Sequence, residues 1–212
     1  MCSLRVKYKT YEFDKTDIHL RTLRDTQEFE DLEGVAEKLG IPESTWALFG
    51  VLWPSGEVLA RLMSQKNVDG LRILEIGCGI ALPSLILNSK GADISATDYH
   101  PLSDEFLVAN TALNSGKKIP FYLCDWNSDS EEAGKYDLII GSDVLYERDH
   151  VKLLSRFLEK HANPICEIIL VDPGRGNMSH FKKEMIVHGF EFEVLKKEIG
   201  EEYKGQIVRF SR

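Results

Sequence analysis

The sequence predicts an α/β fold in which a mostly parallel sheet is covered by helices on both faces. Short apolar runs with strand character alternate with segments of helical periodicity along most of the 212 residues. This alternation is typical of parallel strands joined by helices. A glycine-rich turn at residues 77–79, directly after one predicted strand, marks a place where such sheets hold ligands.

The first 50 residues are predicted to form an extension ahead of the main sheet. Apolar and charged residues alternate over about residues 4–20, which indicates a small β-hairpin or meander. Residues 27–39 and 43–49 have the pattern of helices. Another helix is expected to start near Trp53 and Pro54, because proline suits a first helical turn and an apolar stripe follows it.

Residues 51–212 are predicted to form the core, so that residues 1–212 make one domain. Strands are expected at residues 72–76, 92–97, 119–124, 136–142 and 166–171. Helices are expected at residues 82–87, 103–114, 149–161 and 178–188. Two final apolar runs, at residues 190–196 and 205–211, are expected to pair antiparallel. The chain has no internal repeat or long linker that would divide it.

Composition narrows the class of function. A formal net charge of −8 argues against a nucleic acid as the main substrate, because phosphate contacts need a concentrated cationic face. The cysteines are widely spaced and form no CxxC pair; they are Cys2, Cys78, Cys124 and Cys166. We therefore expect reduced thiols, no resident metal, a cytoplasmic location and a monomer without membrane segments.

The glycine turn and a later acid indicate a nucleoside site. Gly77 and Gly79 allow the backbone to turn tightly, and Asp98 follows Gly79 by nineteen residues, at the end of the next predicted strand. An acid at this spacing hydrogen-bonds a ribose in Rossmann-like folds. Position 82 holds leucine where dinucleotide-binding turns have a third glycine, so a pyrophosphate is the poorer interpretation.

Polar or aromatic side chains follow five predicted strands at the point where each strand ends. Because the carboxyl ends of parallel strands lie at one edge of a sheet, we expect these side chains to meet in space. They are Glu75 to Gly79, Asp98 and Tyr99, then Cys124, Asp125 and Trp126, then Ser142, Asp143 and Tyr146, and finally Asp172, Pro173 and Gly174.

The first of these clusters resembles a known family. The ExGxG pattern that starts at Glu75, with its trailing acid at Asp98, resembles motif I and the partner acid of the seven-strand methyltransferases that use S-adenosyl-L-methionine. The resemblance implies a Rossmann-like seven-strand sheet with an antiparallel C-terminal strand. It also implies a cofactor that carries a positive sulfonium and no phosphates, which an acidic lip at Glu75 suits.

A second motif narrows the resemblance. The tetrad from Asp143 to Tyr146, after the strand at residues 136–142, is similar to the signature of the family 16 group, many of whose members methylate protein lysines. The match spans about residues 10–175. It implies a protein substrate that presents a lysine, with Asp143 holding the incoming ammonium and Tyr146 walling the channel.

The resemblance also implies roles around the cofactor. Gly77 and Gly79 would let the backbone approach its amino acid end, and Asp98 would accept hydrogen bonds from its ribose hydroxyls. Asp125 would accept from the adenine amino group, beside Trp126 as an apolar plate. Trp53 is interpreted as either a core residue or a lid edge over the cofactor, and Ser142 as a further residue that contacts it.

Four alternatives remain open from sequence. Asp143 could simply cap the helix that follows it. The acceptor could be a small molecule, such as a nicotinamide or an amine. Asp143 and Asp172 could share a divalent cation in a metal-dependent O-methyltransferase. The chain could also be a non-catalytic module that binds the cofactor or a partner.

Overall fold

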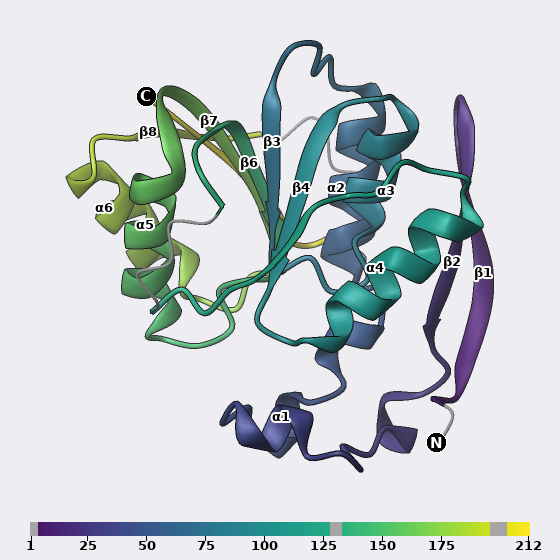
Figure 1. The fold of residues 1–212 in the computed structure, drawn as a ribbon. Coiled ribbons are helices and arrows are strands. Elements are labelled where there is room, and N and C mark those ends of the chain that lie inside the picture. The colour runs from purple at the N-terminus through teal and green to yellow at the C-terminus, as the bar shows by residue number, and fades with distance from the viewer. Residues whose placement is uncertain (1–3, 128–132, 196–202) are drawn as a thin grey trace.

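The computed structural model describes residues 4–127, 133–195 and 203–212, and it contains the expected sheet (Figure 1). Seven strands have the order β5-β4-β3-β6-β7-β9-β8. They are β3 (Arg72–Ile76), β4 (Asp93–Asp98), β5 (Phe121–Leu123), β6 (Tyr136–Ser142), β7 (Ala162–Asp172), β8 (Glu191–Val194) and β9 (Gln206–Ser211). Strands β3 to β7 are parallel, and β9 runs antiparallel to both β7 and β8. The predicted fold class is confirmed.

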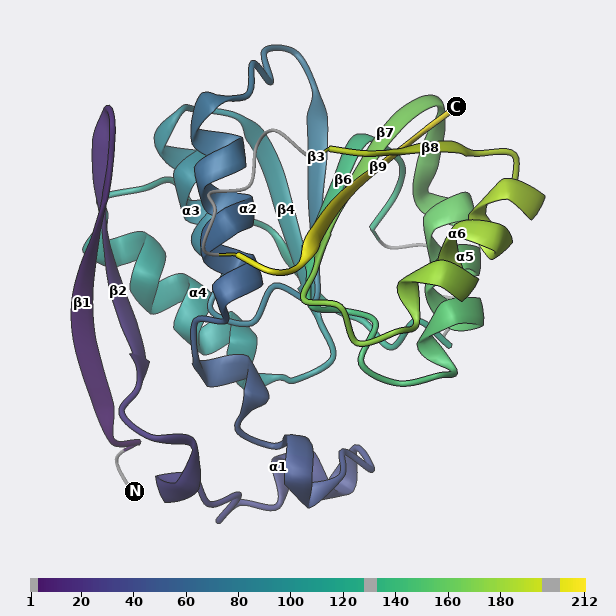
Figure 2. The same cartoon turned by 180° about the vertical axis from the view of Figure 1, so that it is seen from behind.

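Helices cover both faces of this sheet, as expected. On one face lie α2 (Pro54–Gln65), α3 (Leu82–Ser89) and α4 (Leu102–Leu113), and on the other lie α5 (His150–His161) and α6 (Met178–Val187) (Figures 1 and 2). Alternate side chains of β6 are buried on opposite faces of the sheet, as a sheet covered on both faces requires. Leu138 and Ile140 join the core under α2 and α3, whereas Ile139 joins the core under α5 and α6.

An N-terminal hairpin packs outside α4, which confirms the predicted β extension. Strands β1 (Val6–Phe13) and β2 (Thr16–Leu23) pair antiparallel. Asn110 on α4 accepts from the Arg21 N–H at 2.7 Å and donates to the Arg21 carbonyl at 3.1 Å. Asn114, one turn later, makes the same two bonds to His19, each at 2.8 Å. These two amides thus satisfy the free edge of β2 as a neighbouring strand would.

The predicted helices at residues 27–39 and 43–49 are wrong. In place of two continuous helices the structure has one short α-helix, α1 (Val35–Lys38), and three short 3-10 turns, η1 (Thr26–Glu28), η2 (Glu43–Thr45) and η3 (Leu48–Gly50). Gly34 has a left-handed φ of 62°, and the Asp31 carboxylate accepts from the backbone N–H groups of Val35 and Glu37, so a helix cannot run through the first segment. The whole segment wraps below the carboxyl ends of the strands (Figure 1).

The remaining differences are small. Strand β7 begins four residues before the predicted strand, because residues 162–165 continue straight from α5 with a shift in register against β6. Cys2 and residue 196 of the predicted run at 190–196 lie outside the described residues. Cys78, Cys124 and Cys166 are buried and free of disulfides. Within the described ranges, none of the helices has both the length and the apolar character needed to cross a membrane.

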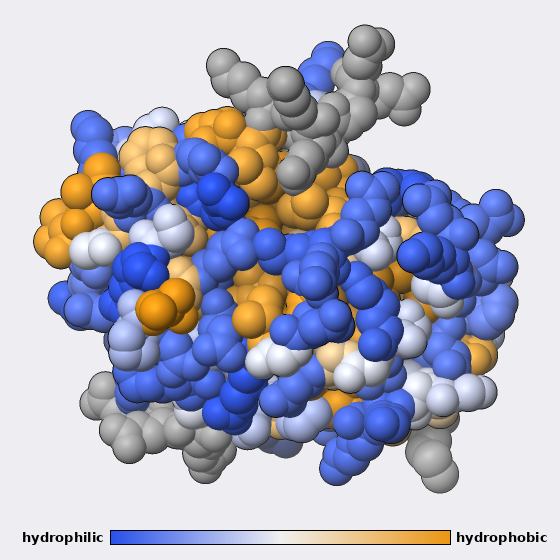
Figure 3. Space-filling model, turned by 90° about the horizontal axis from the view of Figure 1, so that it is seen from above, coloured by the Kyte–Doolittle hydropathy of each residue, from blue (hydrophilic) through white to orange (hydrophobic). Residues whose placement is uncertain are grey.

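The end of the molecule above the amino ends of the strands is mainly hydrophilic. Figure 3 shows polar side chains over most of this face, with separate hydrophobic patches between them. Scattered exposed apolar side chains are ordinary on protein surfaces. The opposite end, below the carboxyl ends, carries the pocket that is described next.

Replacing Asn110 by alanine is expected to destabilise the protein through the hairpin. The change leaves the N–H and carbonyl of Arg21 without partners at a half-buried edge, which costs about 1 to 3 kcal/mol. Urea unfolding of Asn110→Ala measures this loss. The control Val108→Ala lies on the exposed face of the same helix and should change stability by less than about 0.5 kcal/mol. Equal unfolding midpoints for the two variants would contradict the proposed edge function.

Candidate functional site

A pocket of about 610 Å³ lies below the carboxyl ends of the parallel strands. One wall comes from residues 40–53 of the N-terminal segment, and the others come from the turns after β3, β4, β5, β6 and β7. The pocket brings together all ten residues that the sequence selected for the site. They are Trp53, Glu75, Gly77, Gly79, Asp98, Asp125, Trp126, Ser142, Asp143 and Tyr146.

The turn after β3 requires its two glycines for steric reasons. Gly77 has a φ of 56° and Gly79 a φ of 53°, both in the left-handed region. A Cβ atom on Gly77 would lie 2.8 Å from Val144 Cγ1, and one on Gly79 would lie 2.9 Å from the Phe49 carbonyl oxygen. The glycines therefore let two other walls of the pocket approach the turn, in addition to leaving space for a ligand.

Glu75 connects the end of β3 to the start of α3. Its buried carboxyl group accepts hydrogen bonds from the backbone N–H of Ser84, at 2.9 Å, and from the Ser84 hydroxyl. Burial raises the pKa of Glu75 from 4.5 to about 8, and the two bonds from Ser84 only partly oppose this. At neutral pH the carboxyl group of the protein alone is therefore mostly protonated.

Asp98 at the end of β4 holds the glycine turn in place. Its carboxylate accepts from the Gly79 N–H at 2.7 Å and from the His100 N–H at 2.8 Å. Burial raises the pKa of Asp98, while these hydrogen bonds act to lower it. Since a carboxylate has about four acceptor positions, the group retains capacity for ligand hydroxyls.

Asp143 forms an ion pair that the sequence did not predict. Its two carboxylate oxygens accept from Nε and Nη2 of Arg175, at 2.7 and 2.9 Å. Asp143 has a left-handed φ of 54°, and its backbone N–H donates to the Val171 carbonyl at the end of β7. The side chain of Asp143 is only 10% exposed, whereas that of Arg175 is 45% exposed. The guanidinium thus covers a nearly buried acid at the mouth of the pocket.

The geometry bears on two alternatives for Asp143, and it shows that the first one is wrong. Helix α5 begins at His150 with Asp149 at its N-cap, so Asp143 does not cap it. In this structure the Asp143 carboxylate, which would share a divalent cation with Asp172 in a metal-dependent enzyme, is paired with Arg175 instead. The pocket lining does not include Asp172, Pro173 or Gly174, contrary to expectation, and the Asp172 carboxylate accepts from the Gly174 N–H at 2.8 Å. Among the described residues, no group of three His, Cys, Asp or Glu side chains could hold a metal ion.

An aromatic wall surrounds His150, a residue that the sequence did not single out. Its ring makes edge contacts with Trp126, at 5.1 Å between centroids, and with Tyr146, at 4.6 Å. His150 Nδ1 also lies 2.9 Å from the Val144 carbonyl oxygen. The Tyr146 side chain remains 44% exposed. Its partial burial and, to a smaller extent, the nearby charge of Asp98 raise its pKa to about 12. In the sequence, only the position of His150, four residues after Tyr146, could have pointed to it.

The N-terminal wall is fixed to the rest of the site by specific contacts. The Trp53 indole N–H donates to the Leu48 carbonyl at 3.0 Å, so that its half-buried ring forms the pocket edge. Phe49 stacks on His100, with centroids 4.0 Å apart, and the Tyr99 hydroxyl donates to the Leu39 carbonyl. Burial lowers the pKa of His100 to about 4, so it packs as a neutral ring. Of this wall the sequence selected Trp53, but it missed Leu48 and Phe49, which lie at the end of a predicted helix.

Comparison with known proteins identifies a family that this chain matches. A family model described as lysine methyltransferase matches residues 36–185. The chain is 28% identical over 138 residues to the electron transfer flavoprotein beta subunit lysine methyltransferase of Mus musculus, covering 63% of this chain and 52% of that protein. It is 26% identical over 160 residues to EEF1A lysine methyltransferase 3 of Xenopus tropicalis, covering 71% and 70%.

The solved structures support the fold. Magnesium protoporphyrin IX methyltransferase from Synechocystis PCC 6803, with bound SAM, matches with a TM-score of 0.59 and 22% identity. The match covers 89% of this chain and 88% of that chain. The chain spans about half the length of the Mus musculus relative and 70% of the length of the Xenopus tropicalis relative.

The raised pKa of Glu75 predicts a specific pH dependence of stability. Between the ordinary pKa of 4.5 and the folded value of about 8, the folded state binds more protons at this group, so its contribution to stability falls as pH rises. Glu75→Gln removes this titration and should lose less stability than the wild type between pH 5 and pH 9. Thermal unfolding across this range tests the difference. Glu105→Gln, an exposed change on α4, should follow the wild-type profile.

Proposed function

The chain belongs to the lysine methyltransferase family, and from this we propose that it transfers a methyl group from S-adenosyl-L-methionine to a lysine side chain of a protein substrate. The observation that carries the proposal is one pocket in which the glycine turn, Asp98, Asp143 and Tyr146 all converge. In this proposal residues 1–212 act as one monomeric catalytic domain. Its buried free thiols suit the reducing cytoplasm.

The pocket offers groups that suit this cofactor, which supplies an electrophilic methyl group on a sulfonium. Asp98 keeps acceptor capacity for ribose hydroxyls, and the turn at Gly77 and Gly79 leaves backbone accessible for the amino acid end. Asp125 and Trp126 line the same pocket, where the carboxylate would accept from the adenine amino group beside the indole ring. Ser142 and Trp53 would complete the enclosure.

Glu75 would compensate the positive charge of the sulfonium. Its carboxyl group is mostly protonated in the protein alone, because burial raises its pKa to about 8. A cation in the same pocket favours the ionised form of a nearby carboxyl group. The two hydrogen bonds from Ser84 already orient the Glu75 carboxyl group, so Glu75 can ionise without moving.

The acceptor side of the pocket must receive a lysine and also deprotonate it. A lysine amine has an ordinary pKa of about 10.4, so it arrives as an ammonium ion that cannot attack the methyl group. Asp143 is proposed to hold and orient this cation, with Tyr146 as the wall beside it. An unpaired acid would raise the lysine pKa and so oppose its deprotonation.

Arg175 resolves this conflict in the proposal. Its guanidinium neutralises the Asp143 carboxylate, so the acid can orient an amine without stabilising its proton strongly. A carboxylate has about four acceptor positions, so Asp143 can hold the amine while its pair with Arg175 stays closed. The proton then leaves to water, and positioning and desolvation do most of the remaining work.

The experiment that tests the proposal is labelling of a proteome from cells that lack this protein. Purified protein and S-adenosyl-L-methionine with a labelled methyl group are added to the lysate, and the labelled products are separated by size. Label on lysine in a protein band supports the proposal. Label confined to small molecules supports a nicotinamide or amine acceptor instead. No label, together with no binding of S-adenosyl-L-homocysteine in calorimetry, would contradict methyl transfer altogether.

Asp98→Asn should weaken binding of S-adenosyl-L-homocysteine roughly 10- to 100-fold. An asparagine cannot accept from Gly79, His100 and a ribose together, and hydrogen bonds to a charged group are worth about 1.5 to 3 kcal/mol. Isothermal titration calorimetry measures the change. Asp104→Asn, an exposed change on α4, should bind the product as the wild type does. Unchanged affinity in Asp98→Asn would remove Asp98 from the cofactor site.

Arg175→Gln should shift the pH profile of methylation upward by about one unit. Without the guanidinium, Asp143 retains the lysine proton more firmly, so a smaller fraction of the amine is neutral at pH 7. The measurement is kcat against pH, on whichever labelled protein the proteome experiment identifies. Arg156→Gln, an exposed change on α5, is the matched control. Identical profiles for both variants would contradict the role given to Arg175.

A further inference from the structure

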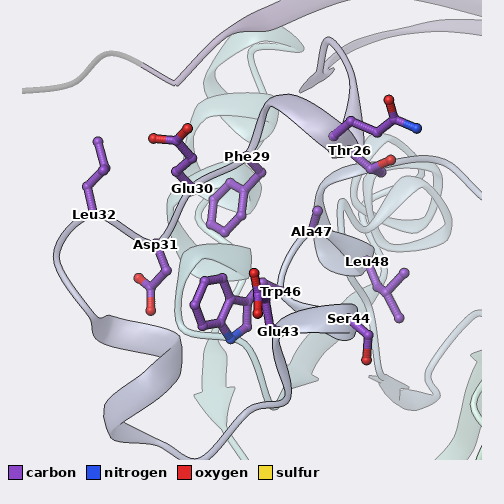
Figure 4. A pocket seen from close by; sticks show the side chains of 11 residues that line it. Thr26, Phe29, Glu30, Asp31, Leu32, Glu43, Ser44, Trp46, Ala47 and Leu48 are labelled. Carbon is purple, nitrogen blue, oxygen red and sulfur yellow. The ribbon is translucent and has the colours of Figure 1, made fainter.

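A second groove lies on the outer side of the segment that forms the N-terminal wall of the pocket. It has a volume of about 530 Å³ and is lined by residues of the stretches 26–32 and 43–48 (Figure 4). Leu48 lines both this groove and the central pocket, while Thr45 lines only the pocket and Trp46 only the groove. The segment at 43–48 is thus a thin wall between the two.

Two aromatic rings form apolar surface in this groove. The Trp46 indole N–H donates to the Ile41 carbonyl at 2.8 Å, which fixes the ring from one edge. Phe29 packs with an edge contact on Phe49, at 5.5 Å between centroids, and Phe49 belongs to the wall of the central pocket. Both rings are half-buried and line the open groove, so part of each ring is available to a partner.

Carboxylates surround these rings. Glu30, Asp31 and Glu43 line the same hollow (Figure 4). Glu30 and Glu43 are exposed, and the described part of the chain gives neither an ion-pair partner. Asp31 stays ionised, because hydrogen bonds from the backbone N–H groups of Glu37 and Val35 outweigh the effect of burial and lower its pKa. The groove therefore combines aromatic faces with uncompensated negative charge.

The sequence around the groove has the same bias. Residues 25–46 contain seven acidic residues and one basic residue, a net charge of −6 in a chain whose total is −8. The acidic residues are Asp25, Glu28, Glu30, Asp31, Glu33, Glu37 and Glu43, and the basic residue is Lys38. A phosphate-bearing partner would be repelled here. A cationic partner would be attracted over the range of the Debye length, about 10 Å at 0.1 M salt.

We propose that this groove binds a basic segment of the protein substrate, next to the lysine that enters the central pocket. The inference rests on the proposed function. Arginine and lysine side chains gain from aromatic faces and from carboxylates together, and the groove presents both within one hollow. Because only the 43–48 segment separates the two sites, a substrate can place its target lysine inside and its neighbouring cations outside this wall.

The test uses a probe that cannot be methylated on lysine. A fluorescein-labelled peptide of alternating arginine and glycine, nine residues long, is titrated with the protein at low salt and without cofactor, and anisotropy is recorded. The variant Glu30→Gln/Glu43→Gln should bind roughly fivefold more weakly than the wild type, since each exposed ion pair contributes a few tenths to 1 kcal/mol. High salt should reduce the difference.

The control variant makes the same charge change elsewhere. Asp14→Asn/Glu191→Gln removes two exposed carboxylates, one between β1 and β2 and one on β8, far from the groove. It should bind the probe within about twofold of the wild type, because screened charges beyond a Debye length contribute little. Equal weakening in both double variants would mean that net charge alone attracts the probe, and it would overturn the proposal. Binding of the probe by Glu30→Gln/Glu43→Gln at wild-type affinity would overturn it as well.

A second measurement separates this proposal from the proposed function. With a peptide that carries one lysine between arginines, Glu30→Gln/Glu43→Gln should raise KM about fivefold and leave kcat unchanged, since removing uniform binding affects KM alone. An unchanged KM would overturn the groove as a substrate site. If no lysine is methylated by any variant while the anisotropy difference persists, the proposed function fails and the groove remains a site for basic peptides.

Discussion

The site depends on the pair of hydrogen bonds that Asp98 accepts from the backbone of Gly79 and His100. The first bond fixes the glycine turn after β3, so that Gly79 lies against the Phe49 carbonyl at a distance no side chain could share. The second fixes His100, on which the Phe49 ring stacks. One carboxylate thus sets the turn, the wall opposite it and the width of the pocket. Any ligand that Asp98 also binds must fit the space that these contacts leave.

Three acids of the pocket have different surroundings. Glu75 is buried with only the two groups of Ser84 for support, and its pKa rises to about 8. Asp98 is also buried, but backbone N–H groups oppose the effect of burial. Asp143 is compensated by a full guanidinium charge from Arg175. The pocket therefore offers a neutral acid, a hydrogen-bonded acceptor and a balanced ion pair, which suits a cationic cofactor and a cationic acceptor that must not both be held too firmly.

The sequence predicted the core and the N-terminal hairpin well and residues 26–50 poorly, for physical reasons. Strands β3 and β6 have the predicted bounds because short, strongly apolar runs bounded by turn residues have few alternatives. All ten selected residues line one pocket because parallel strands bring their carboxyl ends to one edge. Arg175 and His150 act through tertiary contacts that no local pattern encodes. In residues 26–50, Gly34 and the Asp31 hydrogen bonds override an apparent helical pattern.

The failure of that helical pattern has a functional reason. Carboxylates at the density of residues 25–37 would repel one another along a helix. As two short turns, the 43–48 segment instead directs Thr45 to the pocket and Glu43 and Trp46 to the outer groove. Contacts from Phe49 and Trp53 hold this wall, so the exposed carboxylates of Glu30 and Glu43 need not contribute to stability. The charges of Glu30 and Glu43 are therefore available to select a partner, and they line a groove that shares Leu48 with the proposed methyl-transfer pocket.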